Sequence, residues 1–427
     1  MKLEFKKASV RKIAWGSPTR IENNILYVDR EELSALLKKD TRIVEWDFDF
    51  AAPGDKTRIL PIKDAIEPRV KLDGEGYFAG VLGPADTAGN GATFVLDGCA
   101  VLTVGSIIGT QEGFVDMSGP ASYHTPFSKT HNLVVTANPA KGIEKHLHEE
   151  AIRMAGLKTA LYLADKCREG KIDSVEVFDK APAFEETKKF PELPKVAYLK
   201  LLITQGLLHD SYIYGVDVKK MLPTFMHPNE MIDGALISGN CVSACDKNTT
   251  WHHQNDPVIR ELYRQHGKEI NFIGVIPTLE DTVLIGKERS AAFNLKLLKE
   301  FSIDGVVITE EGCGNPDTDI CMNARLCEKA GIKTLIISNE VAGNDGASQG
   351  FADSTPEIDA FVSVCNINEL IEVPAMDKVI GIPEAVSRLS GGSSESLRPD
   401  GSMLVEFQTI IGSTCEIGYN KTGAEWI

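Results

Sequence analysis

The stretch RSAAFNLKLLKEFSIDGVVITEEGCGNPDTDICMNARLCEKAGIKTLIISNE, residues 289–340, alternates two kinds of hydrophobic pattern. Residues 289–301 and 319–331 have the length and apolar spacing of amphipathic helices, whereas residues 304–311 and 333–340 hold short runs of valine, isoleucine, leucine and threonine. Short strands separated by helices of about ten to fifteen residues indicate βαβ units, in which the strands are parallel and the connections right-handed. The stretch therefore predicts an α/β layer structure.

The same alternation extends in both directions from this stretch. Residues 195–204 (KVAYLKLLIT) and 270–278 (INFIGVIPT) are continuous apolar runs of the kind that buried parallel strands contain. Residues 360–365 and 378–382 are shorter runs of similar composition. We therefore expect a doubly wound, mostly parallel α/β sheet in the C-terminal half of the chain.

The N-terminal part has a different sequence pattern. Residues 2–10 and 24–29 alternate apolar and polar side chains as strands do, and residues 74–119 are rich in glycine, which indicates tight turns around short buried strands. A long helix is expected over residues 143–170, with Leu147 in its apolar stripe. We therefore expect a β-rich, glycine-containing region over residues 1 to about 140, followed by this helix and the first α/β strands.

Two groups of residues resemble metal ligands. Within the long helix, HLHEE (residues 146–150) offers His146, Glu149 and Glu150, but these side chains also fit the polar, solvated face of that helix. The three cysteines between residues 313 and 327 match neither the paired spacing of structural zinc sites nor the runs of ferredoxins. No metal is predicted at either place.

Composition and charge exclude several classes of function. The chain of 427 residues carries 61 acidic and 45 basic side chains, and a net charge of −16 argues against a nucleic-acid partner. The N-terminus shows no targeting signal, and no apolar segment is long enough to cross a bilayer. We therefore expect a cytoplasmic protein without a membrane partner, whose nine cysteines are reduced.

Two glycine-containing loops follow expected strands, in residues 306–319 and 337–350. The first resembles a dinucleotide-binding turn, but Asp317 stands where that motif needs a third glycine, and the lysine and serine of a phosphate loop are missing. No nucleotide is predicted. Because ligands of α/β sheets bind at the carboxyl ends of the strands, either loop could hold a small carboxylate, and the sequence does not choose between them.

GNCVSACDKNTTWHH, residues 239–253, carries the most unusual group of side chains. Cys241, Cys245, His252 and His253 do not have a recognised zinc spacing, and the thioredoxin-type C-x-x-C pair is absent. A metal site and a thioredoxin-type redox site therefore explain the motif poorly, while an ordinary loop stays open.

The adjacent pair Asn240 and Cys241 offers another chemistry. The Cys241 thiol can attack the carbonyl of Asn240 and convert the amide into a thioester, after which the chain can break. The asparagine can then cyclise, as in inteins, or the cysteine can lose its sulfur and become a ketone. Such a dipeptide occurs often by chance, so the pair alone does not establish self-cleavage.

A longer stretch carries a resemblance. GNCVSACDKNTTWHHQNDPVI, residues 239–259, resembles the processing site of the proprotein for the alpha and beta subunits of component B of glycine/sarcosine/betaine reductase. The N-terminal MKLEF and TRIENNILYVDREEL, the central SYIYGVD (residues 211–217) and the overall length are similar too. The resemblance covers the whole chain.

This resemblance implies a cut between Asn240 and Cys241, giving chains of residues 1–240 and 241–427, with Cys241 converted into an N-terminal pyruvoyl group. The pyruvoyl ketone of the family forms a Schiff base with the amino substrate, so that a selenolate can attack the α-carbon. Cys245, His252 or His253 could assist the acyl shift or proton transfers, or they could simply hold the turn.

The resemblance also implies an oxidoreductase, with thioredoxin as electron donor, that deaminates its substrate towards acetyl phosphate and free amine. The implied partners are a selenoprotein subunit of component B, the selenoprotein component A, the acetyl-phosphate-forming component C and a small amino-acid substrate. Glycine, sarcosine and betaine are not distinguished. Two alternatives stay open: an uncleaved α/β scaffold subunit of such a complex, and a D-proline reductase proprotein.

Overall fold

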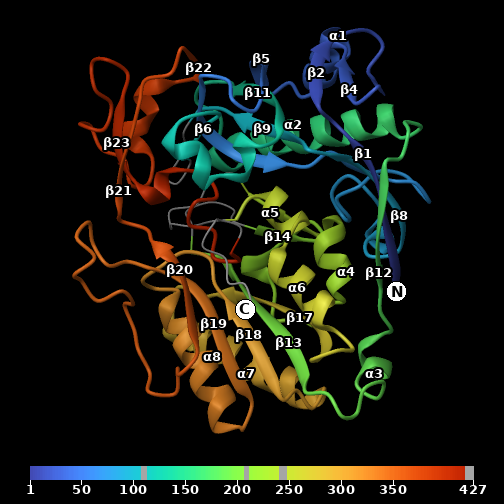
Figure 1. Ribbon diagram of the computed structural model, residues 1–427, viewed down its shortest axis with the longest axis vertical. Helices are drawn as coiled ribbons and strands as arrows, with labels where there is room; N and C mark the ends of the chain where they lie inside the picture. Colours follow the sequence, from blue (N-terminus) through green and yellow to red (C-terminus); the bar gives the residue numbers. More distant parts are fainter. Residues whose placement is uncertain (107–112, 206–210, 240–247, 419–427) are drawn as a thin grey trace.

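A computed structural model describes the chain in four stretches, residues 1–106, 113–205, 211–239 and 248–418. It is a mixed α/β structure with several sheets. Figure 1 shows the N-terminal sheets in the upper half of the molecule and a parallel sheet in the lower half, with α5 (Thr250–Gln254) between them.

The lower half is built on a five-stranded sheet with the order β17-β13-β18-β19-β20, in which every neighbouring pair is parallel. All ten residues of β17 are buried, which explains the continuous apolar run in its sequence. The five strands are β13 (Lys195–Ile203), β17 (Asn271–Glu280), β18 (Gly305–Thr309), β19 (Lys333–Glu340) and β20 (Phe361–Asn366).

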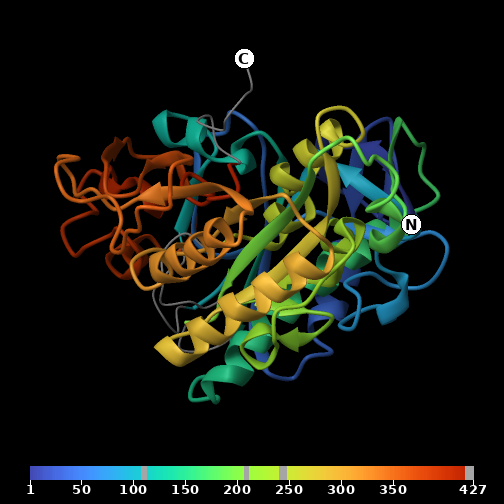
Figure 2. The same ribbon diagram turned by 90° about the horizontal axis from the view of Figure 1, so that it is seen from below.

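Helices cover both faces of this sheet. Leu199 of β13 packs in one core cluster with Leu298 of α7 (Leu284–Glu300) and residues of α8 (Asp317–Lys329). Tyr198, the next residue along the strand, packs in a second cluster with Ile259 of α6 (Pro257–Gln265). Successive side chains of a strand point to opposite faces, so α6 lies opposite α7 and α8. Figure 2 shows α7 and α8 side by side across one face of the sheet.

The upper half contains a six-stranded sheet that nearly closes into a barrel. Its order is β10-β6-β9-β11-β5, with β22 pairing in parallel with β6. An ion pair of 2.6 Å between Lys378 Nζ of β22 and Asp49 Oδ1 of β5 spans the remaining gap. Its strands are β5 (Ile43–Ala51), β6 (Thr57–Ile66), β9 (Cys99–Val104), β10 (Gly113–Asp116), β11 (His131–Pro139) and β22 (Lys378–Gly381).

Smaller sheets complete the described part of the chain. They have the strand orders β12-β1-β8-β7, β2-β4-β3, β15-β14-β16 and β21-β23. Their strands are β1 (Lys2–Ser9), β2 (Lys12–Trp15), β3 (Arg20–Glu22), β4 (Ile25–Val28), β7 (Arg69–Lys71), β8 (Gly91–Asp97), β12 (Ser174–Asp179), β14 (Ser211–Ile213), β15 (Val216–Asp217), β16 (Leu236–Ser238), β21 (Leu370–Val373) and β23 (Met403–Glu406). The other helices include α1 (Arg30–Leu37), α2 (Lys145–Cys167), α3 (Ala183–Glu186) and α4 (Pro228–Glu230).

The C-terminal half differs from the expected fold at its end. Residues 378–382 were predicted to join the parallel sheet, but β22 pairs instead with β6, and β21 and β23 form an antiparallel pair of their own. Three of the four residues of β22 are exposed, so its short apolar pattern carries no information about which strand it joins. The parallel sheet therefore ends at β20.

The long helix also differs from its expected amphipathic form. Glu149 was predicted on a solvated face, but its side chain is fully buried and its Oε1 lies 2.9 Å from Arg153 Nε. Leu147 was predicted in the apolar stripe, but it is 44% exposed. The reason is that α2 packs against β6, β9 and β11 and also contacts α1, so its buried surface extends around much of the helix.

Candidate functional site

The residues that flank the Asn240–Cys241 pair are tied together by hydrogen bonds. Ser238 at the end of β16 donates from its Oγ to the carbonyl of Asn248 at 2.8 Å. The Ser238 amide donates to Thr250 Oγ1, at the start of α5, at 3.0 Å. The described residues on either side of the segment 240–247 therefore meet at one place in the structure.

Glu311 connects this place to the parallel sheet. Its Oε1 accepts hydrogen bonds from the Asn248 amide at 3.3 Å and from Asn248 Nδ2 at 3.0 Å. Its Oε2 accepts from the amide of Ile203, the last residue of β13, at 3.0 Å. His253 Nε2 lies 3.5 Å from Glu311 Oε1. A buried carboxyl group thus joins α5, β13 and the end of β18.

Glu280 is the last residue of β17 and lies beside Glu311. Its side chain is fully buried, and its Oε1 accepts the Glu311 amide at 3.0 Å. Its Oε2 has no hydrogen-bond partner in the described part of the chain. Burial raises the pKa of Glu280 well above its usual value, and the nearby acidic group of Glu310 raises it further. The raised pKa favours the protonated, uncharged form of the Glu280 side chain.

Two more buried glutamates accept hydrogen bonds from neighbouring residues of β19. Ser338 Oγ donates to Glu310 Oε1 at 2.6 Å, and Asn339 Nδ2 donates to Glu416 Oε1 at 2.7 Å. We call Glu280, Glu310 and Glu311, which lie together at the carboxyl ends of β17 and β18, the glutamate cluster. Because burying carboxyl groups is costly, this cluster is poorly explained by stability alone.

The two adjacent histidines of α5 have different surroundings. His252 Nδ1 lies 2.7 Å from Thr249 Oγ1 in the capping box that begins the helix, and burial lowers the pKa of His252 to about 3. His253 lies against Glu311 instead. Neighbouring residues of a helix point about 100° apart, which is why one histidine caps the helix while the other reaches the glutamate cluster.

Helix α5 is also anchored to the upper half of the molecule. Asp64 of β6 accepts hydrogen bonds from the Thr250 amide at 2.9 Å and from Thr250 Oγ1 at 2.6 Å. A buried ion pair of 2.5 Å between Lys200 of β13 and Asp256 fixes the start of α6. The site is therefore held from both halves of the fold.

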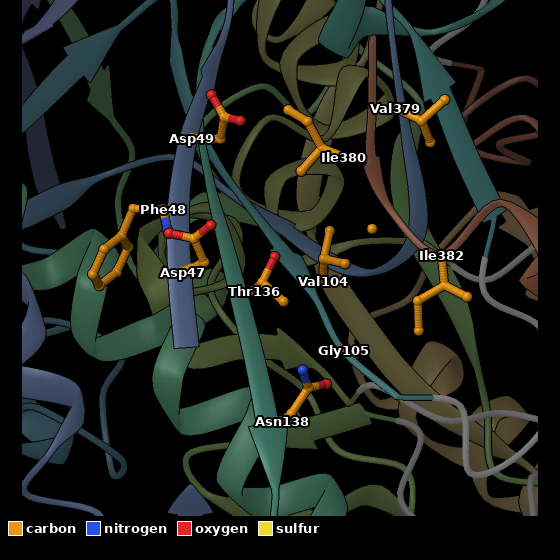
Figure 3. Close-up of a pocket in the computed structure, with 11 residues that line it drawn as sticks. Asp47, Phe48, Asp49, Val104, Gly105, Thr136, Asn138, Val379, Ile380 and Ile382 are labelled. Atoms are coloured by element: carbon orange, nitrogen blue, oxygen red, sulfur yellow. The ribbon is translucent and has the colours of Figure 1, made fainter. Parts of the chain in front are cut away.

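Figure 3 shows a different hollow, a groove of about 300 Å³ on the barrel-like sheet between β5, β11 and β22. The amides of Phe48 and Phe50 on β5 already donate to the carboxylates of Asp47 and Asp49, each at 2.8 Å. The groove contains none of the candidate site residues named in the sequence analysis. It is lined by Asp47, Phe48, Asp49, Val104, Gly105, Thr136, Asn138, Val379, Ile380, Gly381 and Ile382.

Comparisons with known proteins place the chain in a family. The family model described as glycine/sarcosine/betaine reductase component B subunits matches residues 1–425. The chain belongs to this family. The glycine reductase complex component B subunits alpha and beta of Acetoanaerobium sticklandii are 49% identical over 428 residues, covering 100% of both chains. The sarcosine reductase complex component B subunit alpha of Peptoclostridium acidaminophilum is 48% identical over 428 residues, again covering 100% of both.

A more distant relative represents the alternative kept open above. The D-proline reductase proprotein of Acetoanaerobium sticklandii is 22% identical over 363 residues, covering 79% of this chain and 54% of that protein. No solved structure matches the chain. The relatives named here are reductase proteins, and component B names imply a complex of several subunits.

Of the residues predicted for a component B processing site, Asn240, Cys241 and Cys245 lie outside the described residues. His252 and His253 are described and lie in α5. No group of three or more histidine, cysteine or acidic side chains in the described stretches is arranged to hold a metal ion. No helix in those stretches is both long and apolar enough to span a bilayer.

The two glycine-containing loops offer few free amides. In the first, the Gly314 amide already donates to Asp317 Oδ1 at 2.8 Å, and Asp317 Oδ2 accepts the amide of Ala352, outside the loop, at 2.6 Å. In the second, the Gly343 amide donates to Asn368 Oδ1 at 3.2 Å. In the sequence analysis these loops were considered, and Glu280 was not identified as a candidate site residue. The signal was an acidic residue at the end of a parallel strand, the position where ligands of such sheets bind.

Proposed function

We propose that the chain is the self-cleaving precursor of the substrate-binding subunits of a glycine or sarcosine (or betaine) reductase, cut between Asn240 and Cys241. The observation that carries the proposal is the end-to-end match to a single chain whose name gives two subunits, alpha and beta. One chain that supplies two subunits has to be divided. The unusual motif around Cys241 is the candidate cleavage site.

The fold is compatible with such a cut. Strand β13 lies before residue 240, and its two neighbours in the sheet, β17 and β18, lie after residue 247. Strand β22 pairs with β6 across the same boundary. The two product chains would therefore share both large sheets and stay together after the cut.

The residues around the segment 240–247 fit a pyruvoyl group formed from Cys241. The buried Glu280 Oε2, which has no hydrogen-bond partner among the described residues, supports this fit, because a ketone that reacts with amines needs a proton donor nearby. The group itself would supply an electrophilic carbonyl that condenses with the substrate amine to a Schiff base and weakens its C–N bond. Glu311 would hold Asn248, and Asp64 would hold α5, so that the chain beside this group is fixed.

The remainder of the proposed reaction involves other proteins. A selenolate from a selenoprotein partner attacks the α-carbon of the substrate, the electron pair of the C–N bond goes to the nitrogen, and water then frees the amine and restores the carbonyl. Electrons come from thioredoxin, and component C converts the product to acetyl phosphate. The proposed enzyme is therefore an oxidoreductase of the cytoplasm that works within a complex containing the component B selenoprotein subunit and component A.

Denaturing electrophoresis and mass spectrometry of the purified protein test the proposal. We expect two chains, residues 1–240 and 241–427, with the second blocked at its N-terminus and lighter than its sequence by the loss of sulfur. Cys167→Ala, which removes a buried free thiol from α2, is the control that should still divide. A single intact chain would favour the scaffold alternative.

Substrate trapping tests the reductase assignment. Labelled glycine, sarcosine and D-proline are each incubated with the divided protein and reduced with borohydride. We expect label from glycine or sarcosine on the chain that begins at residue 241. Label from D-proline alone would favour the D-proline reductase alternative.

A further inference from the structure

Glu280 has an arrangement that a structural role does not require. Its Oε1 accepts the Glu311 amide, which is one hydrogen bond for one oxygen. Its Oε2 is buried at the carboxyl edge of the parallel sheet and has no partner in the described stretches. A glutamine would accept the same amide at a lower desolvation cost, so the structure does not need an acid here.

The groups around Glu280 are mostly acidic. Glu310 and Glu311 follow β18, and Asp319 lies in α8, where it is paired with Lys287 of α7. Asp319 itself has a pKa raised to about 7 by burial. Because Lys287 is already paired with Asp319, the glutamate cluster favours a proton on Glu280 over a second negative charge.

A second buried polar atom lies close to the same region. Ser211 of β14 is the strand partner of Ser238, whose hydroxyl donates to the carbonyl of Asn248. Ser211 Oγ is buried and has no hydrogen-bond partner among the described residues. Unpaired polar atoms on both β14 and β17 are expected where a small polar ligand binds.

We propose that Glu280 is the proton donor for the amine that leaves the substrate. This inference rests on the proposed function and names the residue that would complete its C–N cleavage. When the partner's selenolate forms the new bond to the α-carbon with its own electron pair, the pair of the C–N bond leaves with nitrogen. The proton on Glu280 Oε2 passes to that nitrogen, and the Glu311 amide stabilises the carboxylate that remains.

The proton that Glu280 gives up is replaced before the next turnover. The next substrate arrives as an ammonium ion and must lose a proton before its nitrogen can react with a carbonyl. The Glu280 carboxylate takes that proton and becomes an acid again. The cleavage step is a substitution, so it needs no oxidant or reductant beyond the selenolate.

The test compares Glu280→Gln with Glu340→Gln in the assembled complex. Glu340 is the last residue of β19 at the same sheet edge, but it is half-buried and outside the glutamate cluster. We expect Glu280→Gln to divide into two chains and, after long incubation, to trap labelled glycine to within about threefold of the parent, although more slowly, while amine release falls about 100-fold or more. Glu340→Gln should release amine at the parent rate.

A spectroscopic readout is independent of turnover. The infrared difference spectrum between the parent protein and Glu280→Gln should contain the carbonyl stretch of a protonated carboxylic acid, and the difference between the parent and Glu340→Gln should not. If Glu280→Gln fails to fold, Glu280→Asp keeps an acid but draws it back by one methylene, and amine release should fall about tenfold or more.

Amine release by Glu280→Gln at the parent rate, or a difference spectrum between the parent and Glu280→Gln without a carboxylic acid band, would overturn the inference while leaving the proposed function intact. A parent protein that neither divides nor traps substrate would overturn the proposed function and this inference together.

Discussion

His252 should make the protein sensitive to acid. Its side chain is only 1% exposed, and burial lowers its pKa to about 3, whereas a histidine of the unfolded chain has a pKa of about 6.5. Between these two values the unfolded chain binds a proton that the folded chain does not. Stability is therefore lost as the pH falls below about 6.5.

The size of this effect follows from the two pKa values. At pH 5 the unfolded histidine is about 1.5 pH units below its pKa and almost fully protonated, while folded His252 is still neutral. The resulting loss is about 2 kcal/mol in the free energy of unfolding relative to pH 7.5. His252→Gln removes this titration and keeps a side chain that can accept the amide of Thr249 in the capping box.

Urea unfolding at pH 7.5, 6 and 5 measures the effect. It should be done in the Cys241→Ala background, so that a single polypeptide unfolds. His146→Gln is the matched control, because His146 is exposed on α2. We expect the stability of His252→Gln to fall about 2 kcal/mol less than that of the parent between pH 7.5 and pH 5. Equal losses in the parent and in His252→Gln would refute the reasoning.

Further predictions concern the site. Cys241→Ala should abolish both cleavage and activity, and Cys241→Ser should cleave more slowly, as followed by electrophoresis; a divided, active alanine variant would contradict the account. Glu311→Gln replaces one of two accepting oxygens with a donor, so the free energy of unfolding should fall by about 1–3 kcal/mol, and cleavage of the chain should slow. If the two product chains appear on denaturing gels at the parent rate, this prediction is wrong. The folded state holds the Glu280 proton that the unfolded state loses, so parent stability should fall as the pH rises, by about 1.4 kcal/mol per pH unit at most. The stability advantage of Glu280→Gln should therefore grow between pH 6 and pH 8, and a constant difference in urea unfolding would contradict this.

The sequence predicted the elements around residues 289–340 because each has a strong local pattern. Strands β18 and β19 and helix α8 lie where they were expected, and α7 begins only a few residues earlier than predicted. The helix α2 was also placed correctly. Pairing between distant strands was not predictable: nothing in the four residues of β22 indicates that they join β6, more than 300 positions away.

The candidate site was predictable only in part. The motif drew attention to His252 and His253, but which of them faces an acidic group depends on the rotation of α5. Glu280 and Glu311 are 31 residues apart in the sequence. They meet because β17 and β18 flank the same strand, β13, and its last residue, Ile203, pairs with Glu280 and donates its amide to Glu311. That strand order is a property of the whole sheet, and the local pattern of each strand does not contain it.

The mass of the purified protein under denaturing conditions tests the central claim most directly. The account predicts two masses, one for residues 1–240 and one for a chain that begins with a pyruvoyl group at position 241. One mass corresponding to all 427 residues, in a preparation that turns over its substrate, would contradict it.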